Sequence, residues 1–160
     1  MKPPLVLRYA KRTRGLNDRP LPDPTDPEMA LIHLADDDEL VREIVHNTLA
    51  EQGHVVGMVD NGADAVRIFQ ARQPDLVILD CAMPRMSGVE ALRQIRILSG
   101  EEHTPILMLT ARRSSKDEEI ALRAGADDYL RKPFSPTQLL VRVELLLLRA
   151  ARTAVMSEAR

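Results

Sequence analysis

Five short apolar runs alternate with five segments of helical spacing, and this alternation limits the possible folds more than any other feature of the sequence. The runs are Leu31–Ala35, Val55–Val59, Leu76–Leu79, Ile106–Leu109 and a weaker Asp128–Leu130. They are almost continuously apolar, as strands buried on both faces are. The segments between them favour helices. The pattern therefore predicts an α/β fold in which five helices cover both faces of a five-stranded parallel sheet.

Each expected helix has its own apolar stripe. The stripes are Val41, Ile44, Val45, Thr48 and Leu49; Ala65, Val66 and Phe69; Val89, Leu92, Ile95 and Leu98; Ile120, Leu122 and Ala124; and Leu139, Val143, Leu146 and Leu147. Gly53 and Gly125 are expected to end the first and fourth helices, because glycine is common just past a helix end. Ser135 and Pro136 favour the start of the fifth helix, as its N-cap and first residue.

Proline divides the chain into three parts. Six of the 11 prolines precede residue 28, and proline is excluded from helix and strand interiors. Residues 1–28 are therefore expected to form a disordered, proline-rich extension. A basic arm that contacts nucleic acid or a membrane surface is the alternative for this segment. We expect the compact domain over residues 29–150 and a C-terminal tail over residues 151–160.

Charge and cysteine content narrow the classes of protein. Residues 1–19 hold six Lys or Arg against one Asp, so the remainder carries a formal charge of −7 within a total of −2. An acidic body argues against direct DNA binding. Cys81 is the single cysteine, which excludes an internal disulfide framework and suits a reducing compartment. The apolar runs are too short for membrane insertion or for a secretory signal, so we expect a cytoplasmic protein.

Polar residues stand where the apolar runs end. Asp36 and Asp37 follow the first run, Asp80 the third, Thr110 the fourth, and Lys132 lies just past the fifth. Ligands of open α/β sheets bind outside the carboxyl ends of the strands. We therefore expect these carboxylates, the hydroxyl and the ammonium to meet at one edge of the sheet.

This set of groups suits phosphoryl transfer. Crowded carboxylates raise one another's pKa, and a hard divalent cation such as Mg²⁺ or Mn²⁺ relieves their repulsion. An ionised Asp80 could then act as a nucleophile and form an aspartyl phosphate. Lys132 and Thr110 would contact the phosphoryl oxygens, over which charge is spread during transfer.

Four stretches of the sequence resemble the receiver domain of two-component response regulators. They are residues 34–42, 74–88, 105–111 and 124–134, which carry Asp36-Asp37-Asp38, Asp80-Cys81-Ala82-Met83-Pro84, Thr110-Ala111 and Lys132-Pro133-Phe134. Together the similarity covers about residues 30–150. The resemblance implies a flavodoxin-like, doubly wound sheet of strand order 2-1-3-4-5 in a three-layer sandwich.

The resemblance also implies roles for the acidic residues. Asp80 corresponds to the phosphorylated aspartate, and Asp36 and Asp37 correspond to the metal-binding pair. The backbone carbonyl of Ala82 corresponds to the third protein ligand of the metal, beside Asp80 itself. Asp38 reads as an N-terminal helix residue favoured by the helix dipole, with a ligand role as the alternative.

Thr110, Lys132 and Tyr129 correspond to the residues that respond to the phosphoryl group. Thr110 and Lys132 match the family's hydroxyl and lysine, and the Lys132-Pro133 peptide bond is cis in the family. Tyr129 matches the aromatic switch that turns inward as the threonine moves; a core tyrosine without this role is the alternative. Ala82 and Arg112 stand at variable positions that tune the rate of dephosphorylation.

The last helix carries a second apolar row of Val141, Leu145 and Leu148 beside its core row. It is either part of a broad buried face or a protein-binding surface. The sequence resembles the subfamily that dimerises through the fourth helix, fifth strand and fifth helix. There, Asp128 would pair with Arg142, and Asp127 with Arg149, across a two-fold axis. We expect a weak homodimer that phosphorylation strengthens.

These observations predict a stand-alone receiver in a phosphorelay. It would accept a phosphoryl group on Asp80 from a histidine kinase or a histidine phosphotransfer protein, docked near Leu40, Ile44 and Asn47. It would not be an enzyme in the ordinary sense, but would assist its own phosphorylation and dephosphorylation and signal by binding a downstream protein. The alternative is a receiver fragment of a longer DNA-binding response regulator or multidomain signalling enzyme. The intact acidic set argues against an inactive scaffold, and a free-standing phosphatase would need a general acid beside Asp80 that the sequence does not place there.

Overall fold

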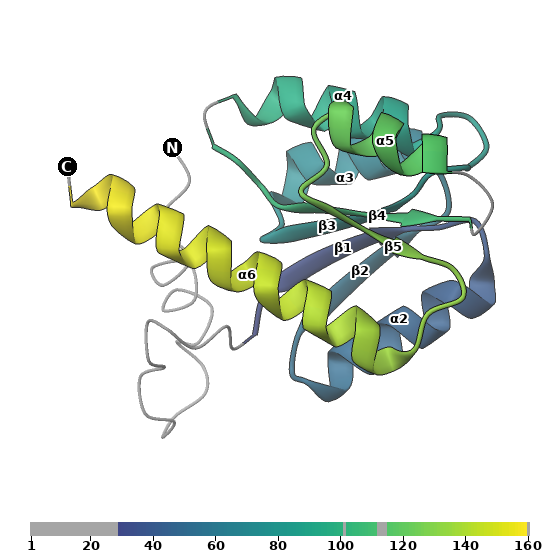
Figure 1. The fold of residues 1–160 in the computed structure, drawn as a ribbon, viewed down its shortest axis with the longest axis horizontal. Helices are drawn as coiled ribbons and strands as arrows, with labels where there is room; N and C mark the ends of the chain where they lie inside the picture. Colours follow the sequence, from purple (N-terminus) through teal and green to yellow (C-terminus); the bar gives the residue numbers. More distant parts are fainter. Residues whose placement is uncertain (1–28, 101, 112–114, 160) are drawn as a thin grey trace.

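The structure is a computed structural model, and it describes residues 29–100, 102–111 and 115–159. The expected extension over residues 1–28 and Arg112 lie outside the described residues. Five parallel strands form one sheet in the order β2-β1-β3-β4-β5, which confirms the predicted order (Figure 1). The strands are β1 (Leu31–Ala35), β2 (Val55–Val59), β3 (Leu76–Asp80), β4 (Ile106–Thr110) and β5 (Asp128–Arg131).

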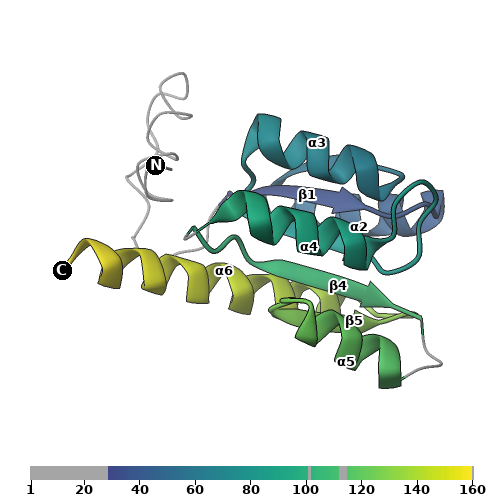
Figure 2. The ribbon, with the colours of Figure 1, turned by 90° about the horizontal axis from the view of Figure 1, so that it is seen from above.

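Helices cover both faces of this sheet, so the molecule has three layers. The helices are α2 (Glu39–Glu51), α3 (Gly62–Arg72), α4 (Gly88–Ser99), α5 (Ser115–Arg123) and α6 (Pro136–Glu158). Figures 1 and 2 show α2 and α6 on one face and α3, α4 and α5 on the other. The predicted flavodoxin-like architecture is thus confirmed.

The sheet separates two aliphatic cores. Leu76 and Ile78 of β3 face the core beneath α2 and α6, whereas Val77 and Leu79 face the core beneath α3 and α4. All five residues of β3 and all five of β4 are buried. This explains why the sequence of these two strands is continuously apolar instead of alternating.

Three strands extend one residue beyond their predicted ends, and each added residue is polar or charged. Asp80, Thr110 and Arg131 are the last residues of β3, β4 and β5. The predicted caps agree with the structure. The Ser135 hydroxyl accepts a hydrogen bond from the Gln138 amide, and Pro136 opens α6. Gly53, directly past the C-cap of α2, has a φ of 89°.

Three apolar stripes differ from their predictions. Ile44 of α2 and Leu98 of α4 were expected to face the core, but they are 40% and 45% exposed. The fourth helix, α5, differs most. Ile120 and Leu122 were expected in its apolar stripe, but both side chains are 45% exposed. Residues two apart point to different sides of a helix, so these two cannot share one core face. The structure buries Glu118 and Ala121 instead, and the carboxylate of Glu118 pairs with Arg131.

The last helix is also longer than predicted. Residues 151–160 were expected to trail the helix as a tail, but α6 continues to Glu158 over 23 residues. No glycine or proline follows Pro136, and the alanine and arginine residues at positions 149–154 have high helix propensity.

Two glycines allow the loop after β3 to pass close to its neighbours. A Cβ atom on Gly88 would lie 1.8 Å from the carbonyl oxygen of Asp80, and one on Gly62 would lie 2.3 Å from that of Met86. The Gly88 amide donates a hydrogen bond to the carbonyl of Cys81 at 3.0 Å. This packing holds the backbone around Asp80.

We predict that Gly88→Ala lowers the free energy of unfolding by roughly 1–3 kcal/mol or more, because the added methyl group overlaps backbone that cannot move aside. Urea denaturation followed by circular dichroism measures the change. Gly57→Ala is the matched control, since its Cβ would meet only the His33 ring, at 3.1 Å. Equal losses in both variants would contradict the close approach at Gly88.

Candidate functional site

The strand register brings the polar strand ends together, as predicted. Ala35 is paired with Leu79, so Asp36 lies beside the end of β3. Asp80 is in register with Leu109, the residue before Thr110. Thr110 is in turn in register with Arg131, the residue before Lys132. Residues nearly 100 positions apart in the chain therefore meet at the carboxyl edge of the sheet.

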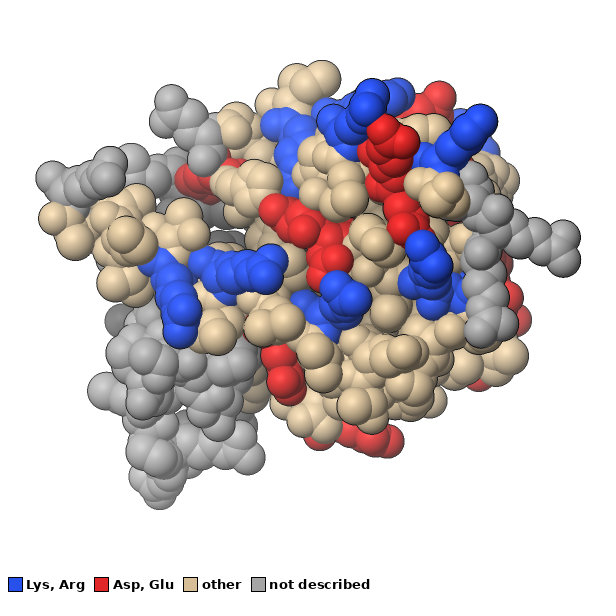
Figure 3. Space-filling model, in the orientation of Figure 1, with Lys and Arg blue, Asp and Glu red and all other residues tan. Residues whose placement is uncertain are grey.

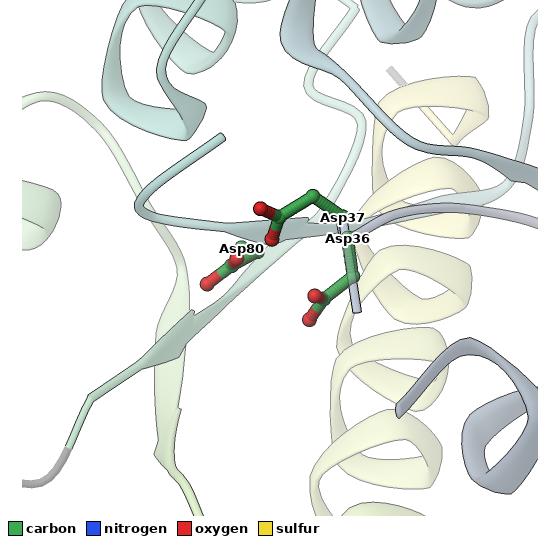
Figure 4. Close-up of side chains that lie close together, drawn as sticks. All are labelled: Asp36, Asp37 and Asp80. Carbon is green, nitrogen blue, oxygen red and sulfur yellow. The ribbon is translucent and has the colours of Figure 1, made fainter. Parts of the chain in front are cut away.

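Three carboxylates converge at this edge. Asp36, Asp37 and Asp80 each offer a carboxylate oxygen within 4.8 Å of the others, and Figure 4 shows the group. Asp36 is fully buried, Asp80 is 6% exposed and Asp37 is exposed. One side of the group is thus enclosed by protein and the other is open to solvent.

Lys132 supplies the positive charge at the site. Its Nζ lies 2.6 Å from Oδ2 of Asp36 and 3.3 Å from Oδ1 of Asp80. Its backbone amide donates a hydrogen bond to the Thr110 carbonyl at 2.7 Å, and the Lys132-Pro133 peptide bond is cis, as predicted. Burial alone would lower the pKa of Lys132, but the two carboxylates outweigh it and raise that pKa.

The environment of Asp80 disfavours its charged form when no cation is bound. Burial, followed by the nearby charge of Asp36, raises the pKa of Asp80 to about 6, although Lys132 acts in the opposite direction. One ammonium therefore does not compensate the carboxylates. A second cation at this position would favour the ionised carboxylate that nucleophilic attack requires.

Thr110 presents a polar atom with no partner. The residue is fully buried, and its Oγ1 has no hydrogen-bond partner within the described part of the chain. A buried hydroxyl without a partner is costly. An acceptor brought to the site, such as an oxygen of a phosphoryl group, would satisfy it.

Backbone contacts hold the acidic pair in place. One carboxylate oxygen of Asp36 accepts a hydrogen bond from the Asp38 amide at 3.0 Å, and Arg42 donates to the Asp36 carbonyl at 2.8 Å. The Asp38 carboxylate accepts from the amides of Leu40 and Val41 as the N-cap of α2. Asp38 is thus occupied as a cap, which agrees with its predicted helix role.

The donor set fits a hard divalent cation. Carboxylate oxygens are the protein ligands that Mg²⁺ and Mn²⁺ prefer, and three of them lie within reach of one point. The raised pKa of Asp80 reflects burial and, after it, charge repulsion from Asp36, both of which such a cation would offset. Ala82 is exposed on the loop after β3, and the role of its carbonyl as a further ligand stays a prediction.

The predicted switch and dimer residues have contacts within the chain. Tyr129 is half-buried in β5 and packs against the core beneath α4. Asp128 pairs with Arg142 of the same chain at 2.9 Å, and Asp127 pairs with Arg96 at 2.7 Å. The switching of Tyr129, and the pairing of these aspartates and of Arg149 across a dimer, stay predictions.

Several of these ion pairs were not predicted from the sequence. Arg96 of α4 also donates to the carbonyls of Thr104 and Gly125, and His103 contacts Asp127. No local pattern in the sequence signals a contact between residues about 30 positions apart. The buried Glu118 was missed because a glutamate on a helix is usually solvated.

Comparison with known families decides what kind of domain carries this site. The family model described as "Response regulator receiver domain" matches residues 32–144, which include the acidic site and all five strands except Leu31 at the start of β1.

The chain belongs to the response regulator receiver family.

Curated relatives of this receiver domain are longer than the chain. It is 42% identical over 120 residues to "Response regulator MprA" of Mycobacterium sp. (strain KMS), covering 75% of this chain and 51% of that protein. It is 43% identical over 118 residues to the protein of the same name from Mycolicibacterium vanbaalenii, covering 74% and 50%. The chain thus spans about half the length of these relatives.

Solved structures share the fold of this receiver. The Francisella response regulator 1452 receiver domain has a TM-score of 0.69 at 29% identity and covers 75% of this chain and 98% of that one. The Vibrio cholerae chemotaxis protein CheY4 has a TM-score of 0.69 at 34% identity, covering 74% and 98%. NtrX from Brucella abortus has a TM-score of 0.77 at 26% identity, covering 82% and 30%.

Among the residues that the structure describes, no helix of the receiver is long and apolar enough to span a bilayer.

We predict that Asp80→Asn stabilises the metal-free receiver at about pH 7.5 by roughly 1–3 kcal/mol, because it removes a buried charge whose pKa is raised above that of the unfolded chain. The native wild type binds the additional proton as pH falls through about 6. The difference in unfolding free energy should therefore shrink toward about pH 5. Urea denaturation of both proteins in chelator, from about pH 5 to about pH 7.5, measures this difference. A difference that does not change with pH would contradict the raised pKa of Asp80.

Proposed function

We propose that this receiver accepts a phosphoryl group from a phosphohistidine onto Asp80. The observation that carries the proposal is the pairing of a buried nucleophile with a lysine. The Asp80 carboxylate lies 3.3 Å from the Lys132 ammonium, within a group of three carboxylates at the edge where ligands of such sheets bind.

In the proposed transfer, an oxygen of the Asp80 carboxylate attacks the phosphorus atom of the phosphohistidine. A P–O bond forms, the P–N bond breaks, and the electron pair of that bond stays on the imidazole nitrogen. The Lys132 ammonium can leave Asp36 or Asp80 to pair with a phosphoryl oxygen, and the Thr110 hydroxyl can donate to another. These contacts favour the charge that spreads over the phosphoryl oxygens during transfer.

We infer that Mg²⁺, or Mn²⁺ in its place, binds through Asp36, Asp37, Asp80 and the Ala82 carbonyl. When bound, the cation neutralises charge on the carboxylates and on the incoming phosphoryl oxygens. Asp36 stays fixed by the Asp38 amide in this arrangement, and the open side at Asp37 leaves room for the donor. This receiver is proposed to assist its own phosphorylation and dephosphorylation without acting on a separate substrate.

The output is proposed to be a shift between two conformations. Movement of Thr110 toward the phosphoryl group would vacate space next to β5, and Tyr129 would turn into it. Such a change biases an equilibrium that already exists, and the phosphoryl contacts supply the difference in free energy. The unpartnered Oγ1 of Thr110 supports this part of the proposal.

We propose a histidine kinase or a histidine phosphotransfer protein as the phosphodonor. Leu40 and Ile44 of α2 are 64% and 40% exposed, and α2 begins directly after Asp36, Asp37 and Asp38. Together with the exposed, polar Asn47 they form a patch on α2 close to the phosphoacceptor. We also propose that the receiver is cytoplasmic and that it signals by binding a downstream protein. We do not propose direct DNA binding by the receiver.

A second candidate is that the receiver is one part of a longer regulator, either DNA-binding or enzymatic. The observation that favours it is length, since the chain spans about half of the MprA relatives. Under the first candidate the receiver acts by itself, with a weak homodimer through α5, β5 and α6. The reading frame around the coding sequence distinguishes the two.

The proposed phosphorylation is tested by intact mass spectrometry after incubation with acetyl phosphate or phosphoramidate and Mg²⁺. We expect one phosphate adduct on the wild type, none on Asp80→Asn, and none on the wild type in chelator. Asp38→Asn serves as the matched variant and should be phosphorylated. A phosphate adduct on Asp80→Asn would refute the assignment of Asp80 as the phosphoacceptor. So would the absence of an adduct from both the wild type and Asp80→Asn.

We predict that Asp36→Asn and Asp37→Asn each weaken Mg²⁺ binding by at least about tenfold, because each removes a charged oxygen ligand. Isothermal titration calorimetry measures the affinity. Asp38→Asn removes the same charge next to the site while keeping an efficient N-cap, so its affinity should change little. Equal losses in all three variants would show that general charge, and not ligation, attracts the cation.

A further inference from the structure

The solvent face of α6 carries a row of exposed apolar side chains. Val141, Leu145 and Val155 are 49%, 44% and 54% exposed, and Leu148 is half-buried. The core row of the same helix, Leu139, Val143, Leu146 and Leu147, is at most 2% exposed. Since successive helix residues are about 100° apart, the two rows lie on opposite sides of α6.

The exposed row has the spacing of a coiled-coil seam. Val141, Leu145, Leu148 and Val155 follow one another by four, three and seven residues. In heptad notation, Val141, Leu148 and Val155 are at d positions and Leu145 is at an a position. Arg152 is at the other a position of this stretch. A row needed only for the core of one domain would face the sheet, as Leu139 and Val143 do.

Two opposite charges flank this row on its two sides. Glu144 precedes Leu145, and Arg149 follows Leu148. Within the described residues neither side chain forms an ion pair. In a parallel two-stranded coiled coil, a residue at position g meets the residue five positions later on the other helix. Glu144 would thus face Arg149 of a second copy, twice by symmetry, whereas an antiparallel pair would bring like charges together.

The shape of the molecule leaves this face accessible. Figures 1 and 2 show α6 running past the end of the sheet toward the C-terminus, with the rest of the domain on one side of it. Figure 3 shows uncharged side chains between basic and acidic ones over the part of the molecule where α6 runs. The first half of α6 is already ordered by its core row, so association along that half would not bear the cost of folding it.

We propose that a second copy of this chain docks along α6 and forms a parallel, two-stranded coiled coil through Val141, Leu145, Leu148 and Val155. Arg152 at an a position lowers the stability of the seam and favours the paired register, as polar residues there do. This interface differs from a dimer built on the pairs of Asp127 and Asp128, because both aspartates are engaged within the chain. It does not depend on phosphotransfer.

A charge swap tests the seam on the full 160-residue chain. We expect sedimentation equilibrium of the unphosphorylated protein to show a concentration-dependent dimer. Glu144→Lys and Arg149→Glu should each raise the dissociation constant by about tenfold, and the double variant should return it to near the wild-type value. Glu119→Lys on α5 makes the same charge change on another exposed helix and should have no effect.

Cross-linking tests the orientation of the two helices. In a Cys81→Ala background, Leu148→Cys places the thiol next to its own copy across a parallel seam, so mild oxidation should give a covalent dimer. Ile97→Cys, at a 79% exposed position on α4, should stay monomeric. A monomer at all concentrations, or no Leu148 cross-link, would overturn the proposal. So would a dimer that tolerates Glu144→Lys but is lost in Asp128→Lys.

Discussion

The contact of Lys132 with Asp36 and Asp80 is the interaction on which the rest of the site depends. Its ammonium lies between the two carboxylates, at 2.6 Å and 3.3 Å, and it lessens a repulsion that still raises the pKa of Asp80 to about 6. Buried like charges at this distance are unfavourable unless cations accompany them. Such a site suits the cation and the phosphoryl group that we propose for it.

The fold brings Asp36, Asp80 and Lys132 together from distant parts of the chain. The loop after β1, the end of β3 and the loop after β5 each contribute one of them, and the parallel register aligns the strand ends. The close approach of Gly88 to the Asp80 carbonyl holds the loop that follows. The two aliphatic cores keep the sheet rigid behind the site, so the charged edge stays the part that a ligand can rearrange.

Much of this arrangement could be predicted from the sequence, because polar residues that end buried strands must meet at one edge of a parallel sheet. The prediction failed where the local pattern was ambiguous. Ile120 and Leu122 were expected in the core of α5, whose tertiary contacts select Ala121 and the paired Glu118. The extension of α6 past residue 150 was missed because it has no buried row, and only the helix propensity of its alanines and arginines favours it. The pairing of Arg96 with Asp127 depends on the folded α4 and β5 and leaves no local signal.

The most direct test of the central claim is to locate the phosphoryl group by its chemistry. Borohydride reduces an aspartyl phosphate to homoserine but leaves free carboxylates and phosphate esters unchanged. After phosphorylation with acetyl phosphate and Mg²⁺, peptide mapping of the reduced protein should find homoserine at position 80 alone. Homoserine at position 36 or 37, or a phosphoryl group that resists reduction, would contradict the assignment of Asp80 as the phosphoacceptor.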